Sequence, residues 1–512
     1  MAEVQSSRDS AAGAGWGECS PGSYRDLMAQ CGRTSRRGDS IRDRRFSWLS
    51  PVPIWQSRNQ VIAPILGDPT NARRRKWMEA LGRSAEDDLL VDHSGRETLS
   101  FLLAGDTGEG DASQYAVVPP LLTKAADTSF LFLCSDVIYP AGGIEEYEGK
   151  VWCPYRGYDG TIHAIPGNHD WYDDGAAFMH AFCGATAQRP KAGLSVDPRS
   201  WLRALLWRRA PRGTADPRPA TQPAPYFAID AGPLRLLAID TGMTGEIDRD
   251  QAAWLRRMSQ GDRPKLLLTG KPLFVDADHR PGSIEGGGTI DEIVTNAAYN
   301  YIGAVGGDIH NYQRYLVDVG EGRRLAYIVS GGGGAFMHQT HTMPNLDTVE
   351  KLQGKVSEAD MRCYPLRGDS LARYSQLYGH KFRRVGGRKL VIPEKEARLI
   401  VAERIGVTPT RPVAGDVEVS DRSRRAAKVL FKLPARGRGP LHLPFSEWLD
   451  WNEPPMFKHF LRFDVAPEEV RIQCFAVSGC GDAETQPPRE DHLLARRGDD
   501  GRWAWSVVAE DG

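Results

Sequence analysis

The chain has 512 residues, 41% hydrophobic and 26% charged, a composition typical of globular proteins. At roughly 150 residues per domain, this length fits one large domain with extensions or two to three domains. Lys and Arg number 65 and Asp and Glu 66, so the formal net charge is −1 and gives no support to a nucleic-acid or membrane-surface role. The eight cysteines form no CxxC pair, which disfavours a disulfide scaffold and a zinc ribbon.

The N-terminal part of the chain shows no targeting signal. Residues 1–50 are rich in Gly, Ser and Arg, and we expect a disordered, solvated arm followed by a helical lead-in over residues 51–95. A basic start followed by an apolar run is absent, and no stretch is apolar for long enough to span a bilayer. We therefore expect a cytoplasmic protein without a membrane span and without nucleic acid as a dedicated partner.

From about residue 96, short apolar runs that end in Gly or Asp alternate with helix-compatible stretches. Runs this short, apolar on both faces, are typical of strands that are buried on both sides, which predicts an α/β layered fold. In such folds the loops at the carboxyl ends of the strands carry the chemistry. The polar residues at these ends are Asp106, Asp136, Asn168, His169, Asp170, Asp308 and His310.

These strand ends carry the donors that hard cations prefer, namely carboxylates, an amide oxygen and imidazoles. The donors occur in four loops, in the order GDTGEGD, SDVIYPAG, PGNHDWYD and GGDIHNYQRY. Any one of these loops is weak by itself, since a lone GD is mostly a turn and a lone NHD can cap a helix. Four in one order, each directly after a predicted buried strand, indicate a metal site.

The four motifs make the chain similar to the calcineurin-like metallophosphoesterases, with the purple acid phosphatases as the closest motif pattern. They are GDTG at 105–108, SDVIY at 135–139, GNHD at 167–170 and GDIH at 307–310, and the resemblance covers roughly residues 96–345. It implies a sandwich of two mixed β-sheets flanked by helices, with N- and C-terminal extensions. It also implies an enzyme that hydrolyses phosphate esters.

The resemblance further implies two divalent or mixed-valence metal ions, with Fe, Mn and Zn as the candidates. Asp106 and His310 would hold the first ion, with Tyr139 as a further ligand. Asp136 would bridge both ions, and Asn168 would bind the second ion through its amide oxygen. A tyrosine ligand would favour ferric iron and a visible charge-transfer colour.

In the mechanism that the resemblance implies, a metal-bridging hydroxide attacks phosphorus in line. His169 would protonate the leaving alkoxide or stabilise the phosphoryl oxygens, and Asp170 would orient His169. The substrate is a phosphorylated compound of open class, monoester or diester, and the oligomeric state is open too. The alternative is a phosphatase-like scaffold that binds phosphate ligands or partner proteins without turnover.

Two positions depart from the family pattern. The fourth motif normally supplies a histidine to the second ion, but LLLTGKPLF has Gly270 there, with Lys271 beside it; Asp308 replaces the first histidine of the fifth motif. Asp308 can still ligate, whereas Gly270 cannot. Three alternatives are open for the missing ligand of the second ion: water takes its place, another side chain does, or the ion binds weakly. The candidate side chains are His279, His338 and His341. Lys271 could instead place a fixed positive charge there and contact substrate phosphate, which makes it a candidate catalytic residue.

The segments outside the four motifs support only coarse predictions. Residues 185–225 form a Pro- and Arg-rich insertion, and residues 346–512 predict a helical and β-hairpin extension that packs on the catalytic domain. The hairpin is expected over FKHFLRFDVAPEEVRIQCFAVSG, two alternating runs around a short turn. The cysteines are interpreted as small buried hydrophobic residues.

Overall fold

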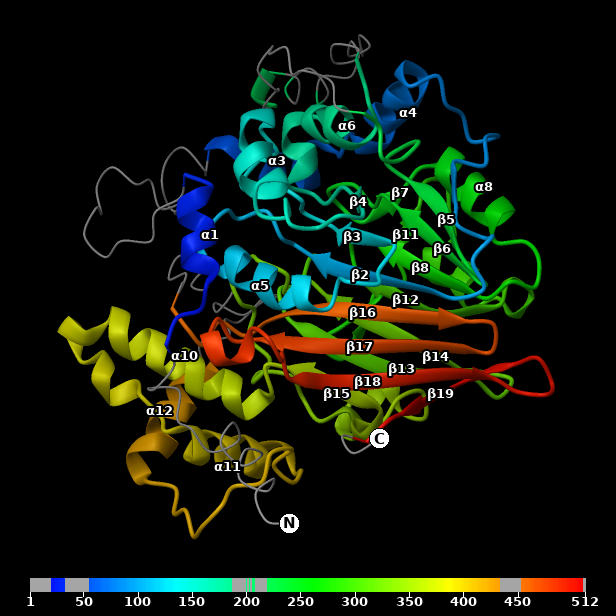
Figure 1. Ribbon diagram of the computed structural model, residues 1–512. Helices are drawn as coiled ribbons and strands as arrows, with labels where there is room; N and C mark the ends of the chain where they lie inside the picture. The colour runs from blue at the N-terminus through cyan, green and yellow to red at the C-terminus, as the bar shows by residue number, and fades with distance from the viewer. Residues whose placement is uncertain are drawn as a thin grey trace, which may run out of the picture.

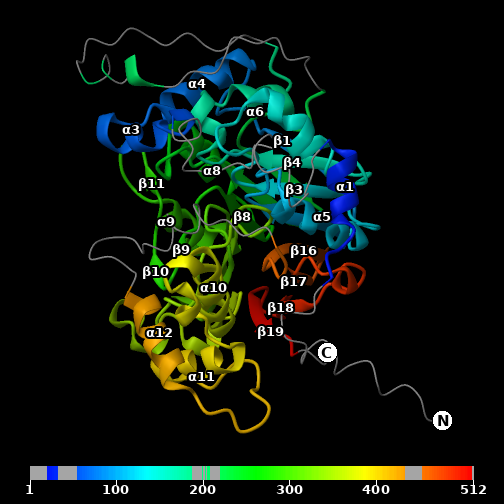
Figure 2. The ribbon, with the colours of Figure 1, turned by 90° about the vertical axis from the view of Figure 1, so that its left-hand side faces the viewer.

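The computed structural model describes residues 20–32, 55–186, 219–432 and 453–509, together with residues 199, 202 and 205–207. Two large mixed sheets pack face to face, with helices on their outer sides (Figures 1 and 2). The predicted fold class is thereby confirmed. Most of the predicted arm and of the Pro- and Arg-rich insertion lies outside the described residues.

One sheet has seven strands, in the order β19-β18-β17-β16-β2-β3-β4. Its parallel half comprises β2 (Leu99–Gly105), β3 (Phe130–Cys134) and β4 (Thr161–Ile165). The antiparallel half comes from the C-terminus: β16 (Lys458–Ala466), β17 (Glu469–Val477), β18 (Arg489–Arg497) and β19 (Trp503–Val507). The hairpin β16–β17 pairs antiparallel with β2, so the C-terminal segment extends the sheet that carries the first three motifs.

The other sheet has eight strands, in the order β1-β5-β6-β8-β12-β14-β13-β15. They are β1 (Leu90–Asp92), β5 (Phe227–Ala231), β6 (Leu234–Ile239), β8 (Lys265–Thr269), β12 (Tyr301–Gly306), β14 (Arg323–Ser330), β13 (Tyr312–Gly320) and β15 (Met361–Tyr364). Within it β6, β8, β12 and β14 run parallel, so their carboxyl ends meet at one edge. Short pairs flank the sheet: β7 (Glu246–Ile247) with β11 (Ser283–Ile284), and β9 (Phe274–Val275) with β10 (Asp278–His279).

The main core lies between the two sheets, because alternate residues of each strand point to opposite faces. In β2, Phe101 points inward and stacks on Phe463 of β16 with ring centroids 4.5 Å apart. Leu102 points outward into a second core. That core is covered by α1 (Tyr24–Gln30), α5 (Ala112–Thr123) and α6 (Ala176–Phe182) (Figure 1).

The remaining helices lie at the ends and sides of the sandwich. Residues 55–95 contain α3 (Asn59–Leu66) and α4 (Thr70–Ala80), and α8 (Arg249–Met258) and α9 (Ile290–Val294) contribute to the main core. Helices α10 (Arg367–Lys381), α11 (Glu394–Ile405) and α12 (Asp421–Lys432) share a core of their own, apart from the sandwich in Figure 2. Among the described residues no helix is long and apolar enough to cross a membrane.

The cysteines correct the sequence analysis in one respect. Cys134, Cys183, Cys363 and Cys474 are buried and unbonded, as expected of small hydrophobic residues. Cys31 and Cys153, however, form a disulfide, and Cys480 is also disulfide-bonded. The Cys31–Cys153 bond ties the end of α1 to a segment 122 residues away. Part of the expected N-terminal arm is therefore a helix fastened to the sandwich.

The stacking of Phe463 on Phe101 predicts how much the C-terminal hairpin contributes to stability. Phe463 is fully buried, so Phe463→Ala should lower the free energy of unfolding by about 3–5 kcal/mol. Denaturant unfolding followed by circular dichroism measures this. The control is Val507→Ala on the edge strand β19, which is 48% exposed and should stay within about 0.5 kcal/mol of wild type. Equal stability of both variants would show that the hairpin lies outside the cooperative core.

Candidate metal centre

The carboxyl ends of strands from both sheets meet at positions where only glycine fits. A Cβ atom on Gly105, at the end of β2, would lie 2.2 Å from the Ser330 carbonyl oxygen at the end of β14. A Cβ on Gly307, after β12, would lie 2.5 Å from the Cys134 carbonyl oxygen at the end of β3. Any side chain at these positions would push the two sheets apart. The glycines of the GD motifs thus bring the carboxylates that follow them within reach of each other.

The residues after these strands adopt left-handed backbone conformations. The φ angle is +55° at Asp106, +73° at Ser135, +33° at Asp136 and +67° at Asp308. Residues with a side chain lose roughly 1–2 kcal/mol each in this region. Such strain is retained where the surrounding structure holds it and where a side chain must point in a given direction. Here it turns three carboxylates away from their strands and into the gap between the sheets.

The Tyr139 hydroxyl lies at the centre of the cluster. Its oxygen is 3.1 Å from Asp106 Oδ1, 3.2 Å from Asp136 Oδ2 and 3.1 Å from His310 Nε2. The whole group is buried, with Asp106 at 0% and His310 at 4% exposure. The structure therefore brings together the four residues that the sequence analysis assigned to the first ion.

This cluster contains more lone pairs than protons. His310 Nδ1 lies 2.8 Å from the Phe336 carbonyl oxygen and must carry the hydrogen there, so His310 Nε2 presents a lone pair to Tyr139. Two carboxylate oxygens and this nitrogen thus surround a hydroxyl that has one proton to donate. A cation would satisfy all four atoms at once.

The pKa values of these residues also favour a cation at the cluster. Burial, together with the neighbouring carboxylates of Asp136 and Asp308, raises the pKa of Asp106 well above its usual value. Burial also raises the pKa of Tyr139 well above its usual value, and Asp106 adds to the effect. For His310, burial lowers the pKa well below the usual value, which keeps the imidazole neutral, as ligation requires. The carboxyl groups and the phenol therefore need a positive charge beside them in order to ionise.

The residues fit one metal ion. An octahedral ion with bonds of about 2.1 Å holds neighbouring donors about 3 Å apart, close to the separations around Tyr139. Within the described ranges, no three His, Cys, Asp or Glu side chains could hold an ion by themselves. An ion at this cluster would therefore also take the tyrosine oxygen as a donor.

His338 packs directly against His310. Its ring stacks on that of His310 with centroids 4.2 Å apart and an interplanar angle of 8°. His338 Nδ1 accepts a hydrogen bond of 3.0 Å from the His310 backbone N–H. His338, one of the candidate substitutes for the missing ligand, thus holds His310 in position instead.

The other two candidate substitutes have different partners. His279 Nε2 lies 2.9 Å from Asp291 Oδ2, and His341 Nδ1 lies 3.0 Å from Ser370 Oγ. Neither contact involves a residue of the four motifs.

His169 lies beside Tyr139, with ring centroids 4.5 Å apart. Its Nδ1 donates to the Pro140 carbonyl oxygen at 2.8 Å, so Nε2 is the nitrogen that takes up or releases a proton. The Asp170 carboxylate accepts hydrogen bonds of 2.9, 3.2 and 2.9 Å from the backbone N–H groups of Val137, Ile138 and Gly167. The hydrogen bond that orients the His169 ring is thus the one to Pro140, and Asp170 fixes the loop that carries Asp136 and Tyr139.

The residues assigned to the second ion lie around a lysine ammonium group. Lys271 Nζ lies 2.5 Å from Asp308 Oδ1 and 3.5 Å from Asn168 Oδ1. The Asn168 amide also donates to the Tyr172 hydroxyl at 2.7 Å. A Cβ atom on Gly270 would lie 2.7 Å from Thr241 Oγ1, so a ligating side chain at position 270 would have to displace the Thr241 hydroxyl. The residues present do not fit the second ion that the sequence resemblance implies.

Two further features shape the centre. Lys458, at the start of β16, donates to the Ala335 carbonyl oxygen in the glycine-rich loop after β14. In that loop, a Cβ on Gly331 would lie 2.6 Å from Asp106 Oδ2. The GGGG run itself was the signal for this close approach, whereas the contribution of the C-terminal strand had no local signal.

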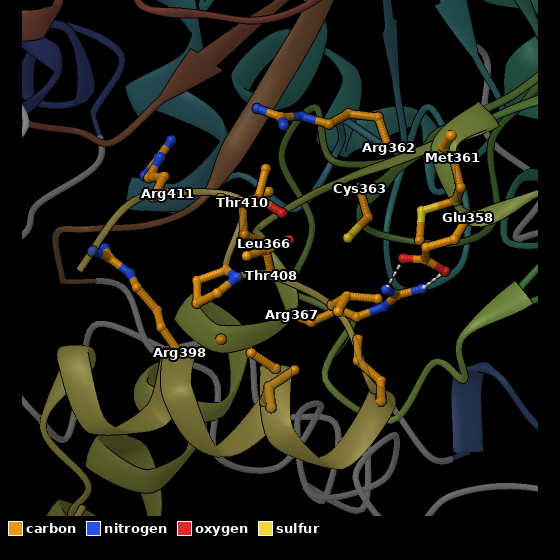
Figure 3. A pocket seen from close by; sticks show the side chains of 17 residues that line it. Glu358, Met361, Arg362, Cys363, Leu366, Arg367, Arg398, Thr408, Thr410 and Arg411 are labelled. Atoms are coloured by element: carbon orange, nitrogen blue, oxygen red, sulfur yellow. Dashed lines mark hydrogen bonds and ion pairs between the residues drawn. The ribbon is translucent and has the colours of Figure 1, made fainter. Parts of the chain in front are cut away.

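A cavity of about 290 Å³ lies elsewhere, between β15 and helices α10 and α11 (Figure 3). Its lining includes no residue of the four motifs but has four arginines, Arg362, Arg367, Arg398 and Arg411. Each pairs with a carboxylate, and these are Glu358, Asp369 and Glu490. These ion pairs hold the helical extension against the sheet.

No family model and no curated protein matches the chain. Solved structures do match it: a purple acid phosphatase from yellow lupin seeds has 10% identity and a TM-score of 0.38, over 80% of this chain and 56% of that one. The PhoD structure has 10% identity and a TM-score of 0.35, over 81% and 72%. TT1561 of Thermus thermophilus has 10% identity and a TM-score of 0.25, over 46% and 90%.

A purple acid phosphatase is thus among the structures that this chain resembles, as the motifs led us to expect. The match spans little more than half of the lupin protein. At such identities and TM-scores these likenesses carry no conclusion about activity, which rests on the chain's own side chains.

The position of Tyr139 predicts a spectroscopic signature. If its oxygen binds ferric iron, the iron-loaded protein should absorb visible light, and Tyr139→Phe should lose that band because the phenolate is gone. Visible absorption after anaerobic loading with iron and reoxidation measures this. Tyr378→Phe, a buried tyrosine in α10, is the control and should keep the band. A band that survives in Tyr139→Phe would remove this residue from the ligand set.

Proposed function

We propose that this protein is a metal-dependent hydrolase of phosphate esters. The observation that supports the proposal best is the buried cluster in which two carboxylate oxygens and an imidazole nitrogen lie 3.1–3.2 Å from one tyrosine oxygen. An ion held there by Asp106, Asp136, Tyr139 and His310 would act as a Lewis acid on a phosphoryl oxygen and on water.

The chain's own residues would perform the remaining tasks. Lys271 is 27% exposed and Asp308 22%, whereas Asp106 is fully buried, so the ammonium lies at the outer side of the cluster. It can therefore receive the negative charge of a phosphate group. His169 Nε2 would handle the proton of the leaving oxygen, because its Nδ1 hydrogen is held by Pro140. Burial lowers the pKa of His169, although Asp136 opposes this, so the acid form is the minor one at neutral pH.

The Cys31–Cys153 disulfide bears on where the protein acts. Disulfides persist mainly in oxidising compartments, since cytosolic reductants keep thiols reduced. The bond therefore favours an oxidising compartment over the cytoplasmic location that the sequence suggested.

Hydrolysis of a simple aryl phosphate tests the proposed function. The protein loaded with iron, manganese or zinc should hydrolyse p-nitrophenyl phosphate or its bis ester, and chelation should abolish the activity. Asp136→Asn should lower kcat/KM at least about 100-fold, because it removes a charged ligand. Asp262→Asn, an exposed carboxylate at the opposite end of β8, should leave kcat/KM unchanged. Tight phosphate binding without turnover under any metal would favour the alternative, a phosphate-binding scaffold.

The role of His169 is tested by varying the leaving group. An alkyl alkoxide needs a proton as it departs, whereas p-nitrophenolate does not. His169→Asn should thus lower kcat/KM for glycerol phosphate by about 100-fold or more, and for p-nitrophenyl phosphate by only a few-fold. Equal losses on both esters would assign His169 to positioning alone.

A further inference from the structure

We propose that the ammonium group of Lys271 takes the place of a second metal ion, so that the centre contains one ion and one fixed organic cation. This inference rests on the proposed function and specifies which charges receive the substrate phosphate.

The first observation is that two oxygen atoms already converge on the ammonium. Asp308 Oδ1 lies 2.5 Å and Asn168 Oδ1 3.5 Å from Lys271 Nζ. These residues follow different strands: Asn168 comes after β4 and Asp308 after β12, while Lys271 comes after β8. Residues from three strands of both sheets thus meet at one positive charge.

The second observation is that none of the three candidate histidines replaces the missing ligand. A Cβ atom on Gly270 would lie 2.7 Å from Thr241 Oγ1 and 3.4 Å from the Pro166 carbonyl oxygen. A side chain at position 270 would therefore have to displace the Thr241 hydroxyl. Of the three histidines that could have replaced the ligand, His279 and His341 have partners outside the motifs and His338 stacks on His310.

The third observation is the balance of charge. Asp106, Asp136 and Asp308 contribute three negative charges when ionised, and Lys271 contributes one positive charge. The two net negative charges that remain are neutralised by one divalent ion, or by a trivalent ion if Tyr139 is ionised. A second metal ion would have to approach the ammonium directly and would meet its repulsion.

The two departures from the motif pattern are therefore a single change. A histidine at position 308 could not neutralise a neighbouring ammonium, whereas the Asp308 carboxylate does so. With an exposure of 27%, Lys271 also retains access to solvent, from which a phosphate group would arrive.

The test combines a count of metal ions with the binding of inorganic phosphate. The full-length protein, loaded with manganese, iron or zinc and dialysed, should contain one ion per chain by elemental analysis. This count requires no variant.

Lys271→Met should retain that one ion, because Lys271 is not a ligand of it, and should bind inorganic phosphate at least 10-fold more weakly in calorimetry. Lys271→Arg should recover most of the affinity by restoring the charge. Lys351→Met, an exposed lysine far along the chain, is the control and should bind phosphate like wild type.

Two ions per wild-type chain would overturn the inference while leaving the proposed hydrolase intact. One ion with unchanged phosphate affinity in Lys271→Met would overturn the assignment of Lys271 alone. No bound ion together with no hydrolysis would overturn both the inference and the proposed function.

Discussion

The candidate site depends on a contact between backbones: the ends of the two sheets touch without side chains between them. Gly105 meets the Ser330 carbonyl and Gly307 meets the Cys134 carbonyl, each closer than any Cβ would allow. A methyl group at one of these positions would separate the sheets. It would also separate Asp106, which follows one sheet, from His310, which follows the other. The electrostatics of the centre is thus a consequence of steric contact between strand ends.

The strands and the residues that directly follow them could be predicted from the sequence. Apolar runs ending in Gly or Asp predicted β2, β3, β4, β6, β8 and β12, because a strand buried on both faces has a pattern readable within a few residues. The donors grouped around Tyr139 follow these strands directly, so their convergence could be expected from the rule that parallel strands end at one edge.

What the sequence could not reveal depends on distances between remote segments. The pairing of β16 with β2 joins residues more than 350 positions apart, as between Ser100 and Asp464, and no local pattern specifies that edge. The disulfide between Cys31 and Cys153 also joins residues that are remote in the sequence, so no local pattern indicated it. The prediction that Asp170 orients His169 was wrong for a different reason. The two residues are adjacent in the sequence, which suggested a side-chain contact, but the turn directs the Asp170 carboxylate to the backbone of residues 137 and 138.

The departures at positions 270 and 308 look like losses in the sequence, because a motif records only which ligand is missing. In three dimensions they are complementary, since the Thr241 hydroxyl lies against Gly270 and the Asp308 carboxylate pairs with Lys271. An ammonium differs from a metal ion in what it can do: it supplies charge and three donors, but it has no vacant coordination position with which to activate water. In the proposed hydrolase, activation of water would therefore belong to the side of the centre around Tyr139, and charge neutralisation to the side around Lys271. A cation attached to the chain is also always present, so only the Tyr139 side would depend on the supply of metal.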